Sequence, residues 1–295
     1  MIKGTTKLLG VIGHPIAHSL SPVMHNAAIS HLGVDFVYLA FPVKPEDLEV
    51  ALLGFGAIDL RGFSITIPHK QAILPLLAEI SPIARATGAV NTVYRTDKGW
   101  CGTNTDVEGF LAPLQTPANL AREGSDWSQK VAVILGNGGA ARAVVAGCAQ
   151  LGCAEIHVVG RNTQNLAEFH DSWVNSPMPV QNLQVHTWDN LSMLISQADL
   201  LVNTTPVGMH PHGEKSPVSA DSLDRISTGA IVYDLIYTPN PTQFLKDAQL
   251  RGARAIDGLE MLVQQGAAAL KIWLDTESVP VDVMRQALRQ HLGLD

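Results

Sequence analysis

Residues 131–143 read VAVILGNGGAARA, an apolar run that turns on glycines into an alanine-rich stretch. A continuous apolar run is typical of a strand that is buried on both faces of a parallel sheet. The spacing Gly136-x-Gly138-x-x-Ala141 fits the dinucleotide fingerprint, in which glycines admit a pyrophosphate to the amides of a helix N-terminus. We therefore interpret the stretch as the strand, turn and helix of a nucleotide-binding domain. A plain strand-to-helix turn is the alternative.

Strand and helix patterns alternate regularly from residue 130 onward. Apolar runs predict strands at Val131–Leu135, 156–159, Leu200–Asn203 and 231–235. Such alternation is typical of a doubly wound α/β domain with right-handed crossovers. The second strand ends in Gly160-Arg161-Asn162, where an arginine suits the 2′-phosphate of NADP and an acidic residue would favour NAD. We expect NADP, and the other interpretation of Arg161 is an ordinary surface charge.

The composition predicts a globular chain with two domains, because 295 residues exceed one typical domain and 46% of them are hydrophobic. A formal charge of -7 without a cluster of lysines or arginines argues against nucleic acid and anionic membranes as partners. No apolar run approaches the roughly 20 residues of a membrane span, and residues 1–13 are too interrupted for a secretory signal, so we expect a cytoplasmic protein. Cys101, Cys148 and Cys153 form no CxxC pair and are expected to be buried free thiols.

The first hundred residues contain a second set of strand and helix patterns. They predict strands at 8–12, 36–41 and 60–67, a helix at 46–53, and a hairpin of 88–94 with 100–103. Ser21, which precedes a proline, is expected to be the N-cap of a helix that ends at Gly33. Pro15 separates His14 from His18, so no helix aligns these histidines and we expect no metal site.

Polar side chains gather at the ends of three strands in this region. The pairs are Ser64 with Thr66, Asn91 with Thr92, and Asn104 with Asp106. Open α/β sheets bind ligands at strand ends, although Asp106 is also a candidate N-cap. Lys70 opens the helix after the strand at 60–67, where the helix dipole disfavours a cation. That placement hints at a function, and a solvated surface lysine is the alternative.

Seven motifs in the same order resemble the shikimate dehydrogenase family. In chain order they are HSLSP (18–22), SITIPHK (64–70), GAVNT (88–92), NTD (104–106), the glycine loop, NTTPVGM (203–209) and DGLEMLVQQ (257–265). The resemblance runs in register over essentially the whole chain, and the ordered set is more specific than any single motif. It implies the reversible reduction of 3-dehydroshikimate to shikimate by NADPH, in the chorismate pathway of aromatic amino-acid biosynthesis.

The resemblance also implies how the chain is divided. Two domains flank a cleft, and helices at 258–274 and Val281–Leu292 return to complete the first domain. We expect an α/β substrate domain of residues 1–107 and 260–295, and a Rossmann-like NADP-binding domain of residues 108–259. The segment 114–129 contains proline and glycine and is a candidate hinge. A homodimer is left open.

The same resemblance implies roles for single residues. The substrate carboxylate would be bound by Ser19, Ser21, Thr66 and Tyr237, and the ring hydroxyls by Asn91, Asp106 and Gln265. Lys70 matches the catalytic lysine, with Asp106 beside it. The expected cofactor contacts are Gly136, Asn137, Gly138, Gly139, Ala140, Gly160, Arg161, Asn162, Leu235 and Gly258, the last beside the nicotinamide.

The chemistry of Lys70 fits this role. Hydride reduction of a ketone leaves negative charge on the oxygen, so the site needs a proton donor within hydrogen-bond reach. An ammonium supplies both charge and proton, and the carboxylate of Asp106 can orient it. The sequence leaves open whether Lys70 chiefly transfers the proton or chiefly stabilises the charge.

Two departures from the family pattern leave alternatives open. Many members carry asparagine at Ser64 and alanine at Asn137, and the shorter serine leaves room for some activity on quinate. One alternative is therefore a quinate/shikimate dehydrogenase that accepts NAD. The absence of an acidic residue at position 161 argues against it. Another alternative is a sensor that binds shikimate without turnover. The presence of both Lys70 and Asp106 argues against a sensor.

Overall fold

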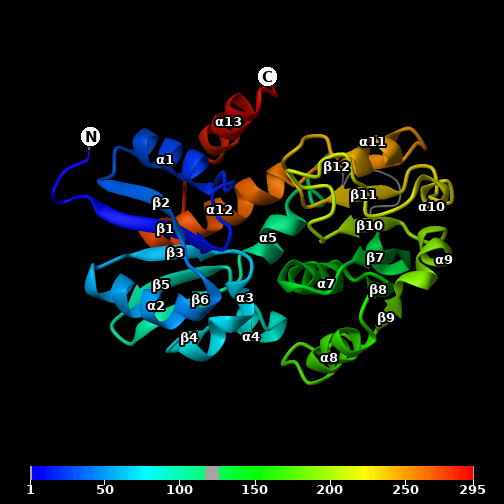
Figure 1. Ribbon diagram of the computed structural model, residues 1–295, viewed down its shortest axis with the longest axis horizontal. Helices are drawn as coiled ribbons and strands as arrows, with labels where there is room; N and C mark the ends of the chain where they lie inside the picture. Colours follow the sequence, from blue (N-terminus) through cyan, green and yellow to red (C-terminus); the bar gives the residue numbers. More distant parts are fainter. Residues whose placement is uncertain (1, 117–125, 295) are drawn as a thin grey trace. The chain divides into compact units, whose positions relative to one another are not determined.

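The chain forms two units, and a computed structural model describes its residues 2–116 and 126–294 (Figure 1). The first unit comprises Met1–Gly109 and Leu262–Asp295, and the second unit comprises Phe110–Met261. The chain leaves the first unit within helix α5 (Asp106–Leu111) and returns within helix α12 (Leu259–Leu274). Of the expected hinge at 114–129, residues 117–125 lie outside the described part and the others belong to the second unit. The connections between the units are therefore helical, which corrects the hinge prediction.

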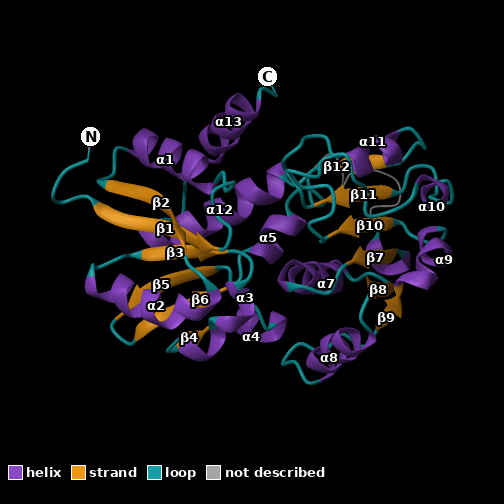
Figure 2. Cartoon of the chain, viewed as in Figure 1, coloured by secondary structure: helices purple, strands orange, loops and turns teal. Residues whose placement is uncertain are grey.

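The first unit is built on a mixed sheet with the strand order β2-β1-β3-β5-β6-β4 (Figure 2). Strand β1 is parallel to β2 and β3, whereas β5 is antiparallel to β3 and β6, and β4 is parallel to β6. The strands are β1 (Lys7–Gly13), β2 (Phe36–Pro42), β3 (Gly62–Ile65), β4 (Glu79–Ile80), β5 (Thr92–Thr96) and β6 (Gly99–Thr103). The hairpin predicted from the sequence is thus confirmed as β5 and β6.

Helices cover both faces of this sheet. On one face His25 of α1 and Trp273 of α12 contact the ring of Tyr38, and α13 packs on α1. On the other face Phe55 of α2 contacts Phe63 of β3. The helices are α1 (Ser21–Leu32), α2 (Leu48–Ala57), α3 (His69–Ala72), α4 (Pro82–Thr87) and α13 (Val281–Leu292), with short 3₁₀ turns at Pro45–Asp47 and Leu74–Leu76.

Two local predictions for the first unit are wrong. The strand expected at 60–67 is only Gly62–Ile65, and all four residues are buried because helices cover both faces. Ser64, which was expected at a strand end, is therefore buried. Ser21 is the first residue of α1 and not its N-cap; Leu20 occupies that position without a side-chain cap. The end of the helix at Gly33 is confirmed, with φ +66°.

The second unit has an entirely parallel sheet with the order β12-β11-β10-β7-β8-β9. The strand order reverses between β7 and β10, as in doubly wound dinucleotide-binding folds, which confirms the predicted fold class. The strands are β7 (Val131–Leu135), β8 (Glu155–Gly160), β9 (Leu183–Thr187), β10 (Leu200–Asn203), β11 (Ile231–Asp234) and β12 (Arg254–Ile256). Strands β9 and β12 were not predicted, because β9 carries several polar residues and β12 is only 3 residues long.

Strand β7 shows why its sequence is continuously apolar. Val133 and Leu135 pack in one core cluster with residues of α9, α10 and α11, and the alternate residues Ala132 and Ile134 are equally buried on the opposite face. The helices of this unit are α7 (Gly139–Leu151), α8 (Thr163–Val174), α9 (Leu191–Ile195), α10 (Ala220–Leu223) and α11 (Gln243–Gln249), with 3₁₀ turns at Trp127–Gln129 and Trp188–Asn190.

The sequence also predicted the state of the cysteines and the absence of a membrane-spanning segment. Cys101, Cys148 and Cys153 are buried free thiols, as expected. None of the helices in residues 2–116 and 126–294 combines the length and the apolar composition that a membrane crossing requires.

Candidate active site

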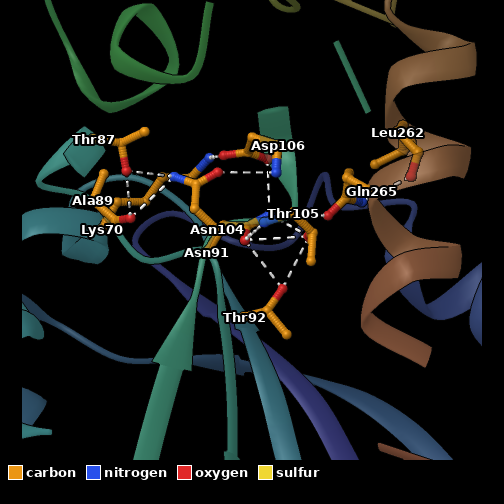
Figure 3. A network of polar contacts seen from close by, with 10 residues as sticks. All are labelled: Lys70, Thr87, Ala89, Asn91, Thr92, Asn104, Thr105, Asp106, Leu262 and Gln265. Atoms are coloured by element: carbon orange, nitrogen blue, oxygen red, sulfur yellow. Dashed lines mark hydrogen bonds and ion pairs between the residues drawn. The ribbon is translucent and has the colours of Figure 1, made fainter. Parts of the chain in front are cut away.

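Lys70 and Asp106 form an ion pair in the first unit (Figure 3). Lys70 lies in α3 and Asp106 is the first residue of α5. The Nζ of Lys70 donates to Oδ2 of Asp106 at 2.5 Å, and the Nδ2 of Asn91 donates to Oδ1 at 2.8 Å. The exposed fractions of the lysine and aspartate side chains are 17% and 8%. Both carboxylate oxygens are therefore held, while the ammonium still reaches solvent.

Asn91 connects this pair to the strand ends and to the returning helix α12. Its Oδ1 accepts the backbone N–H of Thr105 at 2.7 Å, and its Nδ2 also donates to the hydroxyl of Thr105 and to Oε1 of Gln265, at 2.9 and 3.3 Å. The Nε2 of Gln265 in turn donates to the carbonyl of Leu262 at 2.7 Å. Four residues named from the sequence, Lys70, Asn91, Asp106 and Gln265, thus lie in one hydrogen-bonded network (Figure 3).

Asn104 leaves the carboxylate of Asp106 available for Lys70. The Oδ1 of Asn104 accepts the backbone N–H of Asp106 at 3.0 Å, and its Nδ2 donates to the carbonyl of Ala89 at 3.0 Å. An N-cap role for Asp106 is not observed, since its two oxygens bond Lys70 and Asn91 instead. The sequence named Asn104 with Asp106 as a polar pair after a strand, whereas Thr105 was named only as part of a motif.

The candidate carboxylate-binding residues Ser19, Ser21 and Thr66 lie where β1 and β3 end. The backbone N–H of Ser21 donates to Oγ of Ser19 at 3.3 Å. Thr66 packs against Gly13 so closely that a Cβ on the glycine would lie 2.5 Å from the Thr66 methyl carbon. In the described part of the chain no hydrogen bond joins these three side chains to the network of Lys70. Tyr237 follows β11 and belongs to the second unit, whereas the other substrate candidates belong to the first.

The glycine loop of the second unit follows β7 at the point where the strand order reverses. Gly136 has φ +101°, and a Cβ there would lie 2.8 Å from Oγ1 of Thr204, so the close approach and the backbone both require glycine. Gly138 occupies the N-cap position of α7, whose 13 residues begin at Gly139. The first-turn amides, among them that of Ala140, have no partner within the helix and suit a phosphate. Asn137 lies in the same loop.

Gly160, Arg161 and Asn162 form the turn after β8. The Oδ1 of Asn162 accepts the backbone N–H of Asn165 at 2.9 Å and caps α8. Arg161 is exposed, and no hydrogen bond or ion pair is found for its guanidinium among the described residues. This cation is therefore available to a charged ligand at the end of β8.

Leu235 and Gly258 meet through their backbones. The N–H of Gly258 donates to the carbonyl of Ile236 at 3.3 Å, and a Cβ at Gly258 would collide with the carbonyl oxygen of Leu235. No side chain fits at position 258 unless the backbone moves. Gly258 therefore fixes how closely the start of α12 approaches the end of β11.

The sequence reasoning missed a buried carboxylate at the end of β11. Asp234 is fully buried and accepts hydrogen bonds from Thr242 Oγ1, Asn203 Nδ2 and the N–H of Ile236, at 2.7, 3.0 and 3.1 Å. Burial raises the pKa of Asp234 to about 6, against the opposing effect of these hydrogen bonds. An acidic residue that ends an apolar run was the only signal for it. Across the described ranges no cluster of three His, Cys, Asp or Glu side chains could hold a metal ion.

Known proteins resemble this chain along its whole length. Residues 11–93 match the family model described as the shikimate dehydrogenase substrate binding domain. Residues 258–289 match the model described as the shikimate 5'-dehydrogenase C-terminal domain. A protein of Trichormus variabilis named shikimate dehydrogenase (NADP(+)) is 68% identical over 294 residues, which cover 100% of both chains.

Solved structures agree with the sequence matches. A shikimate dehydrogenase in complex with NADP+ superposes with a TM-score of 0.87 at 35% identity, over 99% of this chain and 98% of that one. The shikimate 5-dehydrogenase of Thermus thermophilus, in complex with NADP(H) and shikimate, superposes with a TM-score of 0.81 at 33% identity. That match covers 97% of this chain and 99% of the other.

Proposed function

The chain belongs to the shikimate dehydrogenase family, and from this premise we propose that it interconverts 3-dehydroshikimate and shikimate with NADP as cofactor. This reaction belongs to aromatic amino-acid biosynthesis. The observation that carries the proposal is the ammonium of Lys70, held 2.5 Å from the carboxylate of Asp106 inside a network of otherwise neutral amides and hydroxyls.

Lys70 and Asp106 are the catalytic residues of this proposal. NADPH, when bound, supplies a hydride to the carbonyl carbon of the substrate. Lys70 holds a proton at Nζ for the carbonyl oxygen, where negative charge develops, and Asp106 directs that ammonium. Because the lysine side chain is 17% exposed, its proton can be replaced from solvent after each turnover.

The remaining substrate contacts are assigned from the positions of polar groups. Ser19, Ser21 and Thr66 offer hydroxyls at adjacent strand ends and suit a carboxylate. The phenol of Tyr237, in the second unit, stays a prediction that rests on the family resemblance alone. Asn91, Asp106 and Gln265 suit the ring hydroxyls, because amide and carboxylate groups can both accept and orient hydroxyl protons.

The second unit suits NADP in two respects. The loop from Gly136 to Ala140, including Asn137, Gly138 and Gly139, brings free helix amides to the end of β7, and the helix dipole there favours a pyrophosphate. The unpaired guanidinium of Arg161, between Gly160 and Asn162, suits a 2′-phosphate. Leu235 and Gly258 are the proposed contacts of the nicotinamide, at the place where the start of α12 closely approaches the end of β11.

The setting of the enzyme is also part of the proposal. Three buried free thiols suit a reducing compartment, so we assign the protein to the cytoplasm. Its partner is a small-molecule substrate and not nucleic acid, in keeping with a formal charge of -7. A homodimer stays a prediction.

Initial rates on the purified protein test the function directly. Shikimate and quinate are each assayed with NADP and with NAD, and the reaction is followed by nicotinamide absorbance. We expect high activity only with shikimate and NADP. Comparable rates with quinate or NAD would contradict the assigned specificity but keep the chemistry of Lys70. Shikimate binding without turnover would contradict the enzyme and favour a sensor.

A further inference from the structure

Tyr38 is a fully buried tyrosine of the first unit that has no part in the proposed function. It lies in β2, and its phenol donates a hydrogen bond to Oγ of Ser64 in β3 at 2.9 Å. Because β1 lies between β2 and β3 in the sheet, the side chain reaches across a whole strand to make this contact. The phenol also interacts with the hydroxyl of Ser21, which is itself buried.

The ring of Tyr38 is held from several sides. His25 stacks on it, with ring centroids 4.2 Å apart and planes 17° apart, and Trp273 contacts it at 5.8 Å. Asn26 binds the backbone of Tyr38 in both directions, with Oδ1 accepting its N–H at 2.9 Å and Nδ2 donating to its carbonyl at 2.8 Å. The indole of Trp273 is fixed in turn by a hydrogen bond to the carbonyl of Val93 at 2.9 Å. The phenol oxygen therefore has little freedom.

Ser64 lies beside the proposed catalytic network. It is directly opposite Thr92 in the antiparallel pair of β3 and β5, so the two side chains share one face of the sheet. The hydroxyl of Thr92 donates to Oδ1 of Asn91 at 3.1 Å, and Asn91 bonds Asp106. Ser64 is thus one strand away from the residues that surround Lys70.

In the hydrogen bond between Tyr38 and Ser64 the donor and the acceptor are defined. Tyr38 gives its single proton to Ser64, which acts as acceptor. A serine that accepts keeps its own proton, and none of residues 2–116 and 126–294 accepts it from Ser64. Burial raises the pKa of Tyr38, so the phenol keeps the proton with which it bonds Ser64. The serine proton is therefore left for a bound molecule.

We propose that Tyr38 is a positioning residue that orients the hydroxyl of Ser64 to donate a hydrogen bond to the substrate. This inference rests on the proposed function. The position that is asparagine in many relatives thus works here through two residues: a short serine that makes the contact and a buried phenol that sets its direction. Tyr38 itself does not touch the substrate.

The variant Tyr38→Phe tests the role, because it removes the hydroxyl and keeps the ring between His25 and Trp273. We expect the KM for shikimate to rise about 5- to 10-fold, the effect of one lost hydrogen bond, with kcat and the KM for NADP changed less than about 2-fold. Tyr94→Phe is the matched control, since Tyr94 is a half-exposed tyrosine of the same unit, and it should leave all constants unchanged.

A double-mutant cycle with Ser64→Ala separates positioning from packing. If Tyr38 acts through Ser64, Tyr38→Phe has no further effect on the KM for shikimate once Ser64 is alanine. An equal rise in KM in both backgrounds would overturn the inference, and so would an unchanged KM in the single variant. If the wild-type protein reduces 3-dehydroshikimate, the proposed function stands whatever the variants show. If the wild-type protein is inactive, both the proposed function and this inference are overturned.

Discussion

The ammonium of Lys70 has one protein partner in the described structure, the carboxylate of Asp106. Its other N–H groups are therefore available to an oxygen atom of a bound molecule. At the scale of the single residue, the site combines one fixed charge pair with several neutral groups of fixed direction. Such an arrangement stabilises charge that appears only during the reaction.

Lys70→Ala should lower kcat by about 100-fold or more and change the KM for shikimate much less, because the lost interaction is strongest in the transition state. Steady-state rates at saturating NADP measure both constants. Lys98→Ala is the matched control, since Lys98 pairs with Glu79 at 2.7 Å on the surface of the same unit, with 63% of its side chain exposed. Near-normal turnover of Lys70→Ala would remove the lysine from the mechanism.

Arg161→Ala should raise the KM for NADP about 10- to 100-fold, as expected for the loss of a charge-assisted hydrogen bond to a phosphate, and should hardly affect the KM for NAD. Arg225→Ala, at another exposed arginine of the second unit, should change neither constant. Equal effects on both cofactors would show that Arg161 does not select NADP.

Single residues were predictable where their chemistry departs from their surroundings. Lys70, Asn91 and Asp106 are polar residues at strand ends, and the sequence alone drew attention to them. Tyr38 was not predictable, because an aromatic residue in an apolar strand reads as core. Its contact with Ser64 reaches across β1, and it depends on the order of the strands in the sheet, which is a property of the fold.

At the scale of the element, two glycines of the second unit lie at close approaches between neighbouring segments. Gly136 faces Thr204, and Gly258 faces the carbonyl of Leu235. In both places a strand end is tied to a neighbouring segment with no space for a Cβ. Both glycines lie in loops that follow strands, so the close approaches are made by loop residues that the strands hold in place.

Gly258→Ala should weaken NADP binding and lower the melting temperature, because the new Cβ would collide with a backbone oxygen and the start of α12 would have to move. A thermal melt and a titration with NADP measure the two effects. Gly54→Ala provides the opposite control: no heavy atom lies within 4 Å of the position that its Cβ would take, so it should stabilise α2 by about 0.5–1 kcal/mol. Unchanged NADP affinity in Gly258→Ala would contradict this role.

Elements with strong periodicity were predicted well and weak ones were not. The strand Val131–Leu135 has the predicted bounds, since a continuous apolar run defines it. The helix Val281–Leu292 has the bounds that the family resemblance implied. The strand expected at 60–67 was too long, because alternation in the sequence continued beyond the sheet. Its pairing with β1 and β5 covers only Gly62–Ile65, and a sequence pattern does not contain that information.

At the scale of the whole molecule, the two units respond to acid in opposite ways. His25 in the first unit is fully buried, and burial lowers its pKa from 6.5 to about 3. Between these values the unfolded chain binds a proton that the folded chain does not, so stability falls as the pH falls below 6.5. Asp234 in the second unit has its pKa raised from 3.8 to about 6, so the folded chain binds the extra proton and stability falls as the pH rises toward 6.

Lowering the pH from about 7 to about 5 should therefore destabilise the first unit by about 2 kcal/mol through His25 and stabilise the second by about 1 kcal/mol through Asp234. Thermal melts at both pH values measure the change. His25→Gln should remove the acid loss and Asp234→Asn the acid gain. His31→Gln, at an exposed histidine of the same helix α1, should leave the wild-type response intact. An identical response in His25→Gln would contradict the assignment.

The interruption of the first unit by the second affects how the protein is made. A ribosome releases Met1–Gly109 before Phe110–Met261, and Leu262–Asp295 after both. Until that last segment emerges, Tyr38 and Gly62 lack the indole of Trp273 that covers them, and Asn91 lacks Gln265. The second unit can complete its sheet during synthesis, whereas the first must wait for the final helices. The segment Met1–Gly109 is thus translated before the second unit but becomes native after it, and a chain that stops before Leu262 would contain a nucleotide-binding unit and an unfinished catalytic one.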